Sequence, residues 1–239
     1  MNFLKISSAV LLFAVTLATS TVSATCTNAT LTGVWGYEVG SAVGQIMSNG
    51  AGSLTGSQTV SQGGTIVKQT FTGTYSLNGN CTGSLTVHIT GGTTAHLNFV
   101  LDEANKGFQI IETDSGTLAG GVGLAKGTAT CGLTGINQTF AALLLGKIPA
   151  KGPAAYVAQV ILDGKGSASG VGTFNVNGAI FTASFTGKYT EAANCTGTMQ
   201  ITPTGHSALH FNLVVVSAGK EILLLETDTG TVIAGNMQQ

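Results

Sequence analysis

Arginine is absent from this chain of 239 residues, and charged residues of either sign make up only 8% of it. Without arginine the chain has no planar guanidinium that could bind a phosphate through two parallel hydrogen bonds. It also has no run of basic residues that could follow a nucleic-acid backbone. We therefore expect no nucleic acid among its partners.

Proline is also scarce, at three residues, whereas hydrophobic residues make up 43% of the chain and the net charge is −1. This balance excludes a disordered chain, which has low hydrophobicity and high net charge. No segment has a convincing helical period, and no stretch after residue 24 is apolar for the length of a membrane span. We expect a β-rich protein with no membrane span in its mature chain.

Residues 1–24 have the three parts of a secretory signal peptide. Lys5 supplies a positive charge, the segment from Ala9 to Ala18 is apolar, and small residues precede a cleavage site after Ala24. The sequence predicts a secreted or periplasmic protein.

The remaining chain is a tandem duplication. The phrase FTGTYSLNGNCTG at 71–83 returns as FTGKYTEAANCTG at 185–197, offset by 114 residues (185 − 71). The same offset relates the HLNF and ETDSG segments that begin at His96 and Glu112 to HFNL and ETDTG at His210 and Glu226. We place the first repeat at residues 25–127 and the second at 128–239, and the length suits two small domains.

All four cysteines fall at equivalent places in the two repeats. Four cysteines allow three pairings, and the duplication selects Cys26–Cys81 and Cys131–Cys195. Each bridge closes a loop long enough to contribute about 4 kcal/mol on a chain-entropy model. A zinc site is the alternative, but the absence of a C-x-x-C pair and the oxidising compartment favour disulfides. The sequence predicts no metal and no cofactor.

Apolar and polar residues alternate along several segments, as from Phe71 to Leu77. Asn49-Gly50, Asp163-Gly164 and Asn177-Gly178 are turn-forming pairs. In the first repeat we expect strands near 33–39, 43–48, 52–60, 65–77, 83–90, 95–101, 108–114 and 117–122. This spacing predicts an all-β protein of two tandem antiparallel barrels with about eight strands each, and a two-sheet sandwich is the alternative. If no bulge intervenes, Cys81 and Cys195 share the parity of the apolar face, as expected for a cysteine buried in a bridge.

The second repeat opens differently from the first. Residues Phe140–Leu145 are more apolar than the equivalent segment of the first repeat, and Ile148–Pro153 contains an insertion with two prolines. We interpret this region as a buried or inter-domain strand followed by a longer loop. If Phe140–Leu145 is exposed instead, it is a candidate patch for binding another protein.

Segments in both repeats resemble a known family. CTNATLTGVWGY at 26–37, the Asn/Asp-Gly-x-Gly turn, the F-T-G-x-Y…N-C-T-G phrase and the closing E-T-D-[ST]-G-T are similar, in order, to allene oxide cyclase barrel-like domains of secreted bacterial proteins. The resemblance implies a lipocalin-like eight-stranded barrel. Most such bacterial domains have no assigned activity, and no position here matches the active site of the plant cyclases, so no catalytic residue is carried over.

The candidate ligand-binding residues are those that recur in both repeats: His96, Asn98, Glu112, His210, Asn212 and Glu226. If the apolar faces fill the barrels, the two histidines face solvent, and the glutamates could join a polar cluster only by facing inward. The motifs at Asp114 and Asp228 are similar to the two D-[ST]-G motifs of aspartic proteases. Their position near the end of each repeat favours hairpin turns instead.

Together these observations predict a non-enzymatic protein that binds a small apolar ligand in a barrel mouth or between the barrels. A structural or surface-interaction module with filled barrels, whose partner is another protein, is the first alternative. An isomerase or cyclase is the second, and it rests on fold analogy alone.

Overall fold

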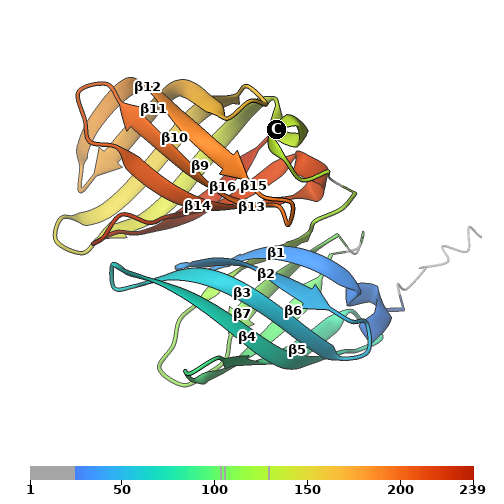
Figure 1. Ribbon diagram of the computed structural model, residues 1–239. Helices are drawn as coiled ribbons and strands as arrows, with labels where there is room; N and C mark the ends of the chain where they lie inside the picture. The colour runs from blue at the N-terminus through green and yellow to red at the C-terminus, as the bar shows by residue number, and fades with distance from the viewer. Residues whose placement is uncertain (1–24, 103, 105, 129) are drawn as a thin grey trace, which may run out of the picture.

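The computed structural model describes residues 25–102, 104, 106–128 and 130–239 (Figure 1). The predicted signal peptide lies outside the described residues. Within them, no helix has the length and apolar character needed to cross a membrane.

The chain forms two closed antiparallel barrels of eight strands each, which confirms the predicted fold class. Strands that follow one another in sequence are neighbours in each barrel, and the first strand pairs with the last to close the sheet. This up-and-down closure leaves no unpaired sheet edge. The alternative of a two-sheet sandwich is wrong.

Barrel 1 contains the short helix η1 (Asn28–Leu31) and the strands β1 (Gly33–Val39), β2 (Ala42–Ser48), β3 (Ser53–Gln62), β4 (Thr65–Leu77), β5 (Thr82–Ile89), β6 (Thr94–Leu101), β7 (Gly107–Glu112) and β8 (Gly120–Ala125). Barrel 2 contains η2 (Leu133–Ile136), β9 (Thr139–Ile148), β10 (Gly152–Leu162), β11 (Ser167–Val176), β12 (Ala179–Glu191), β13 (Thr196–Pro203), β14 (Leu209–Val216), η3 (Ser217–Gly219), β15 (Glu221–Glu226) and β16 (Val232–Gln238).

The alternation of residue types sets the two faces of each strand. In β4, Phe71, Tyr75 and Leu77 are buried inside the barrel, while Thr72 and Thr74 between them are exposed. Successive side chains of a strand point to opposite faces, so one apolar row fills the interior and one threonine row meets solvent. The same strands therefore supply both the core of the barrel and its solvent-exposed surface.

The turn-forming pairs occupy hairpin turns. Asn177 and Gly178 connect β11 to β12 with φ angles of 51° and 86°, and this left-handed pair matches the right-handed twist of the flanking strands. At the β2–β3 turn, the Asn49 side chain accepts hydrogen bonds from the backbone N–H groups of Ala51 and Ser53. Asp163 does the same at the β10–β11 turn.

Both predicted disulfides are present, Cys26–Cys81 and Cys131–Cys195. The predicted strand parity of Cys81 and Cys195 is wrong, because each lies in a turn with φ of 65° rather than in a strand. In that turn the Cys81 N–H donates to the Asn78 carbonyl, and Cys195 makes the equivalent bond to Ala192. Two disulfides indicate an oxidising compartment.

The opening of barrel 2 differs from its expected form. The insertion is not a longer loop, because it extends β9 and β10 and leaves only residues 149–151 between them. Phe140 and Leu144 point into the barrel and are buried, whereas Leu143 and Leu145 are 49% and 57% exposed on its outer face. The segment is thus an ordinary barrel strand with an apolar outer row, and it is not the strand that joins the domains.

Strand pairing aligns the two barrels residue by residue. Val39 pairs with Ala42 in barrel 1, and Leu144 pairs with Tyr156 in barrel 2. Because Ala42 and Tyr156 are related by the offset of 114, Val39 is equivalent to Leu144, at an offset of 105 (144 − 39). From β2 onward the offset is 114, and the difference of nine residues lies in the extended β9–β10 hairpin.

Where the first and last strands of each barrel pair, the large and the small inward residue lie on opposite strands in the two barrels. In barrel 1 the inward Tyr37 of β1 pairs with Gly123 of β8. At the equivalent place in barrel 2, Ala142 of β9 pairs with Met237 of β16. Each closure therefore matches one large side chain with one small residue, but the large one comes from opposite strands.

The barrels pack through their outer surfaces (Figure 1). Besides the core of each barrel, a third apolar cluster lies between them and contains Val43 of barrel 1 and Val214, Val216, Leu223, Leu225 and Ala234 of barrel 2. Gly36 permits the close approach, because a Cβ there would lie 2.4 Å from a Val216 methyl and 2.7 Å from a Val214 methyl. The interface thus joins β1–β2 of one barrel to β14–β15 of the other.

Candidate ligand-binding site

Barrel 1 is hollow at one end. A cavity of about 540 Å³ opens where the β1–β2, β3–β4, β5–β6 and β7–β8 connections meet. Its lining is mostly apolar and includes Val39, Ala42, Ile46, Val60, Phe71, Leu85, Val87, Ile89, Ala95, Leu97, Phe108 and Ile110. The inward-facing row of barrel 1 is mostly apolar, as it is in barrel 2, but in barrel 1 it encloses space.

The opposite end of barrel 1 is closed. Leu31 of η1 is buried there, and the Trp35 indole N–H donates to its carbonyl at 2.8 Å. The Ser48 hydroxyl donates to the Tyr75 oxygen at 2.8 Å, and the Tyr75 hydroxyl donates to the Asn28 carbonyl at 3.1 Å. These bonds fix η1 as a plug, so the cavity has one mouth.

A short polar chain crosses the apolar wall of the cavity. The Tyr37 hydroxyl donates to Gln58 Oε1 at 2.7 Å, and Gln58 Nε2 donates to Gln69 Oε1 at 2.8 Å. Burial raises the pKa of Tyr37 far above its ordinary value, so the phenol stays neutral and remains a donor. Glu112 of β7 is half-buried and also lines the cavity. The cavity thus offers a few polar groups within an apolar surface.

In barrel 2, larger side chains occupy the equivalent positions. Four positions at the mouth differ most between the barrels. They are Ala42, Val60, Val67 and Gly92 in barrel 1 and, in the same order, Tyr156, Phe174, Phe181 and His206 in barrel 2. The three aromatic rings and the imidazole form a continuous series, with ring centroids 5.3, 4.9 and 3.9 Å apart. This series, with one tilted and two stacked ring pairs, occupies positions that, apart from that of Val67, border the open space in barrel 1.

Glu226 lies inside barrel 2 and is 1% exposed. Burial, and secondly the nearby carboxylate of Asp228, raise the pKa of Glu226 to about 8, and Tyr156 hydrogen-bonds to it. Its Oε2 atom has no hydrogen-bond partner among the described residues. Burial therefore favours the neutral form of Glu226, which contacts Tyr156, the first ring of the series.

The six predicted site residues do not form one cluster. His96, Asn98 and His210 are exposed on outer surfaces, and Asn212 lies in the inter-barrel interface, where its Nδ2 donates to Thr59 Oγ1 at 2.7 Å. Only Glu112 and Glu226 face the interiors. Of the six, Glu112 alone lines the cavity of barrel 1.

The two aspartate motifs are turns, as predicted. Asp114 accepts a hydrogen bond from the His96 backbone N–H at 2.7 Å, and its other oxygen lies 2.7 Å from the His96 ring Nδ1. Asp228 holds His210 in the same way, at 2.8 and 2.7 Å. Each carboxylate therefore fastens a loop to the strand of its own barrel.

One cluster has the composition of a metal site. Cys131, Glu191 and Cys195 place their ligand atoms within 4.8 Å of one another. The two sulfur atoms are joined in a disulfide, so they are not the thiolates that bind zinc. The cluster is explained by the bridge.

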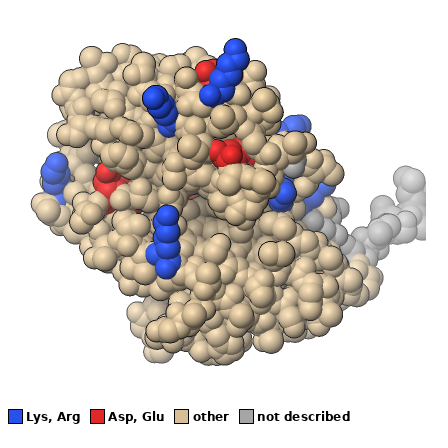
Figure 2. All heavy atoms as spheres, viewed as in Figure 1, with Lys and Arg blue, Asp and Glu red and all other residues tan. Residues whose placement is uncertain are grey.

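Sequence reasoning missed Tyr37, Gln58 and Gln69. A signal existed, because Gln69 has the parity of the inward Phe71, and Gln58 has that of the inward Leu54. A polar residue in an apolar row indicates a buried partner or a polar wall. Figure 2 shows only a few charged side chains on the viewed face, which agrees with the low charge of the sequence.

Comparison of the chain with protein-family models and with curated proteins finds no match.

Proposed function

We propose that this is a non-enzymatic binding protein that holds a small, mainly apolar ligand inside barrel 1. The supporting observation is the cavity of about 540 Å³ with a single mouth and a largely apolar lining. Its size falls within the range of small-molecule sites, which are typically about 300–1,000 Å³. The resemblance to allene oxide cyclase barrel-like domains and the oxidising compartment are consistent with a secreted or periplasmic binder.

The wall of the cavity defines the ligand class. The Tyr37–Gln58–Gln69 chain provides amide and hydroxyl groups for one polar end of a ligand. Glu112 at the wall favours a hydroxyl or amine on the ligand and disfavours a carboxylate, because like charges repel. We expect an uncharged or weakly basic ligand with an apolar body.

The polar groups of the cavity suit binding better than catalysis. Tyr37 and the two glutamines are hydrogen-bonded to one another, and Tyr37 is held neutral. Nucleophilic catalysis requires a nucleophile beside a base, and these groups do not supply that pair.

The test combines native mass spectrometry of the exported protein with titration of N-phenyl-1-naphthylamine, a neutral apolar dye that fluoresces in apolar sites. We expect one dye molecule per chain. Ala42→Tyr introduces the side chain that barrel 2 has at this position and should weaken dye binding by at least about tenfold, or about 1.4 kcal/mol.

Thr72→Tyr is the matched control, because it adds the same ring on the exposed face of β4. It should bind the dye as the unmodified protein does. Absence of dye binding to the unmodified protein, or equal binding by Ala42→Tyr, would overturn the proposal.

A further inference from the structure

Barrel 2 has an apolar outer surface that is not covered within the chain. We define face A as the outer surface of β9–β11, whose exposed apolar residues are Leu143, Leu145, Val157, Ile161 and Val171. These side chains are between 43% and 57% exposed. Strands β10 and β11 lie on the side of barrel 2 away from barrel 1 (Figure 1).

Face A is equivalent to the surface of barrel 1 that barrel 2 covers. Val43 of β2 belongs to the inter-barrel cluster and is 2% exposed, whereas its equivalent Val157 is 55% exposed. Within the chain, the surface of barrel 1 that is equivalent to face A is covered by the outer surface of β14–β15 of barrel 2. A surface like that of β14–β15 is therefore expected to fit face A.

Barrel 1 has the equivalent of that covering surface, and it is also open. We define face B as the outer surface of β5–β7, with Val100 and Ile111 at 50% and 52% exposure. Their equivalents in barrel 2, Val214 and Leu225, are 3% and 0% exposed in the inter-barrel cluster.

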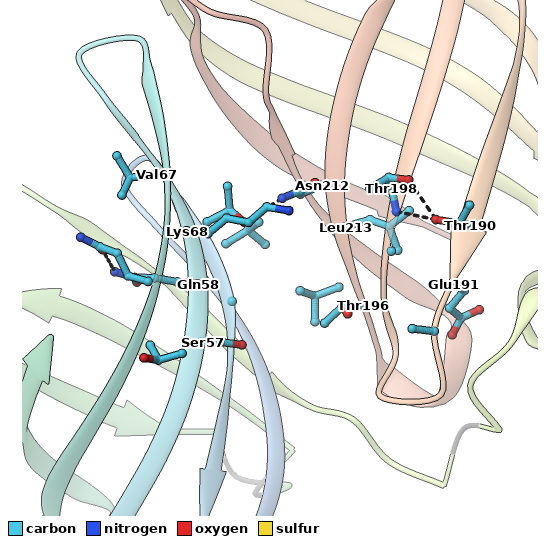
Figure 3. A pocket seen from close by; sticks show the side chains of 18 of the residues that line it. Ser57, Gln58, Val67, Lys68, Thr190, Glu191, Thr196, Thr198, Asn212 and Leu213 are labelled. Atoms are coloured by element: carbon cyan, nitrogen blue, oxygen red, sulfur yellow. Dashed lines mark hydrogen bonds between the residues drawn. The ribbon is translucent and has the colours of Figure 1, made fainter. Parts of the chain in front are cut away.

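Face B also has the shape of the covering surface. It contains a groove of about 510 Å³ formed by β5, β6 and β7 around Val100. The equivalent residues of barrel 2, including Thr196, Thr198 and Asn212, line the groove between the barrels, and Figure 3 shows Asn212 directed from it toward barrel 1. The groove of barrel 2 that faces β2–β3 of barrel 1 therefore has an equivalent on the open outer surface of barrel 1.

Three polar contacts of the internal interface have equivalents on the two open faces. Asn212 donates to Thr59, and their equivalents are Asn98 on barrel 1 and Thr173 on barrel 2. Gln45 Nε2 donates to the Asn194 carbonyl at 2.8 Å.

The equivalents of this second pair are again a glutamine and an asparagine, Gln159 and Asn80, and both are exposed. A backbone bond from Gly230 N–H to the Gly64 carbonyl, at 2.8 Å, has its equivalent in Gly116 and Gly178. Gly116 and Gly178 have φ of 80° and 86°, close to the 86° and 96° of Gly230 and Gly64. Donors and acceptors for all three contacts are therefore in place.

We propose that copies of this chain associate head to tail, with face A of one copy against face B of the next. The two faces differ, and they lie on opposite sides of the molecule, so one contact leaves a free face at each end. Such a heterologous contact extends into a linear assembly unless its rotation closes a ring. This inference concerns the outer surfaces and does not depend on the proposed ligand.

The contact between copies should be weaker than the internal one. Asp102 and Gln109 of face B replace Val216 and Leu223 of the internal cluster, and both are exposed. These polar residues reduce the apolar area that association removes from water. The contact also has no covalent link between its partners, so we expect reversible association that increases with concentration.

The test is analytical ultracentrifugation of the exported full chain and two variants that each block one face. The unmodified protein should form species larger than dimers below roughly 1 mM, the Kd of a very weak contact. Val157→Lys blocks face A, and Val100→Lys blocks face B, so each variant alone should remain a monomer. An equimolar mixture of the two still offers one intact face of each kind and should form a one-to-one dimer and nothing larger.

Thr202→Lys is the matched control, because it adds the same charge at an exposed position of β13 outside face A and face B. It should assemble as the unmodified protein does. The proposal is overturned if the unmodified protein stays monomeric to that concentration, or if Val100→Lys dimerises alone, which would indicate a symmetric contact of face A with itself. Dye binding in barrel 1 is read separately and should be unchanged in both blocked variants.

Discussion

The two barrels share a strand order, a disulfide position and a closing loop, yet one is hollow and the other is filled. The difference is concentrated at four mouth positions, where Ala42, Val60, Val67 and Gly92 of barrel 1 give way to Tyr156, Phe174, Phe181 and His206 of barrel 2. The backbone of this barrel therefore does not determine whether it has a cavity. A few inward side chains at one end do.

The comparison also separates two ways of stabilising the same wall. Barrel 2 gains dispersion contacts and apolar burial from its ring series, and it buries Glu226. Barrel 1 gives up that packing and retains a half-buried Glu112 at an open cavity. A space that could hold a ligand is compatible with the fold because the closed end, with η1 and the disulfide, remains packed.

The largest effect should come from truncating the ring series. Phe174→Ala removes a ring that is 3% exposed and should lower the free energy of unfolding by about 3–5 kcal/mol, the usual cost of removing a core phenylalanine. Val60→Ala at the equivalent position should cost only about 1 kcal/mol, because Val60 borders an existing cavity. Urea unfolding of both variants measures the difference, and equal losses would contradict the contrast between the interiors.

A pH-dependent effect should follow from Glu226→Gln. The folded pKa of about 8 exceeds the ordinary value of 4.5, so between these values the folded state binds a proton that the unfolded state has lost. Stability should therefore be highest below pH 4.5 and fall as the pH rises through about 8.

Glutamine carries no charge, so Glu226→Gln should remove this decline and stabilise the protein most above pH 8. Thermal unfolding between pH 5 and 9 measures it, with Glu112→Gln as the equivalent change in barrel 1. A decline of the same slope in Glu226→Gln would assign it to other groups.

The smallest effect should come from the loop aspartates. Hydrogen bonds from His96 lower the pKa of Asp114, so its contribution to stability is present above the ordinary carboxyl pKa and is lost as the pH falls through the lowered one. Because the pair is exposed, Asp114→Asn should cause only a slight loss at neutral pH. Asp228→Asn in barrel 2 should match it, and unequal thermal shifts would show that the two loops are not held alike.

The sequence predicts the barrels well because the signals are local. Alternation places the strands, turn-forming pairs place the hairpins, and the duplication selects the disulfides. The last strand of barrel 1 was expected at 117–122 but is Gly120–Ala125, because Asp114 fastens a wider loop to His96. Likewise, the parity of Cys81 could not reveal that a turn with positive φ begins before it.

The cavity could not be predicted in the same way. Its volume depends on how the inward rows of eight strands meet, and apart from positions such as Gln58 and Gln69 the rows of both repeats are mostly apolar in sequence. The sequence predicts a longer loop at the insertion Ile148–Pro153, yet the insertion lengthens β9 and β10, since strand pairing extends to Ile148 and Gly152. The sequence also does not show which outer strands face the other barrel, because that depends on how the two barrels pack together.

The exchanged sizes at the closing strands bear on how the chain reaches this structure. Two similar repeats in one chain could close incorrectly, with β1 pairing with β16 and β9 with β8. In such a hybrid, Tyr37 would meet Met237 and crowd the interior, while Ala142 would meet Gly123 and leave a void. Overpacking and voids both destabilise a core. The pairing of a large with a small residue in each barrel therefore favours closure of each repeat on itself over closure with the other repeat.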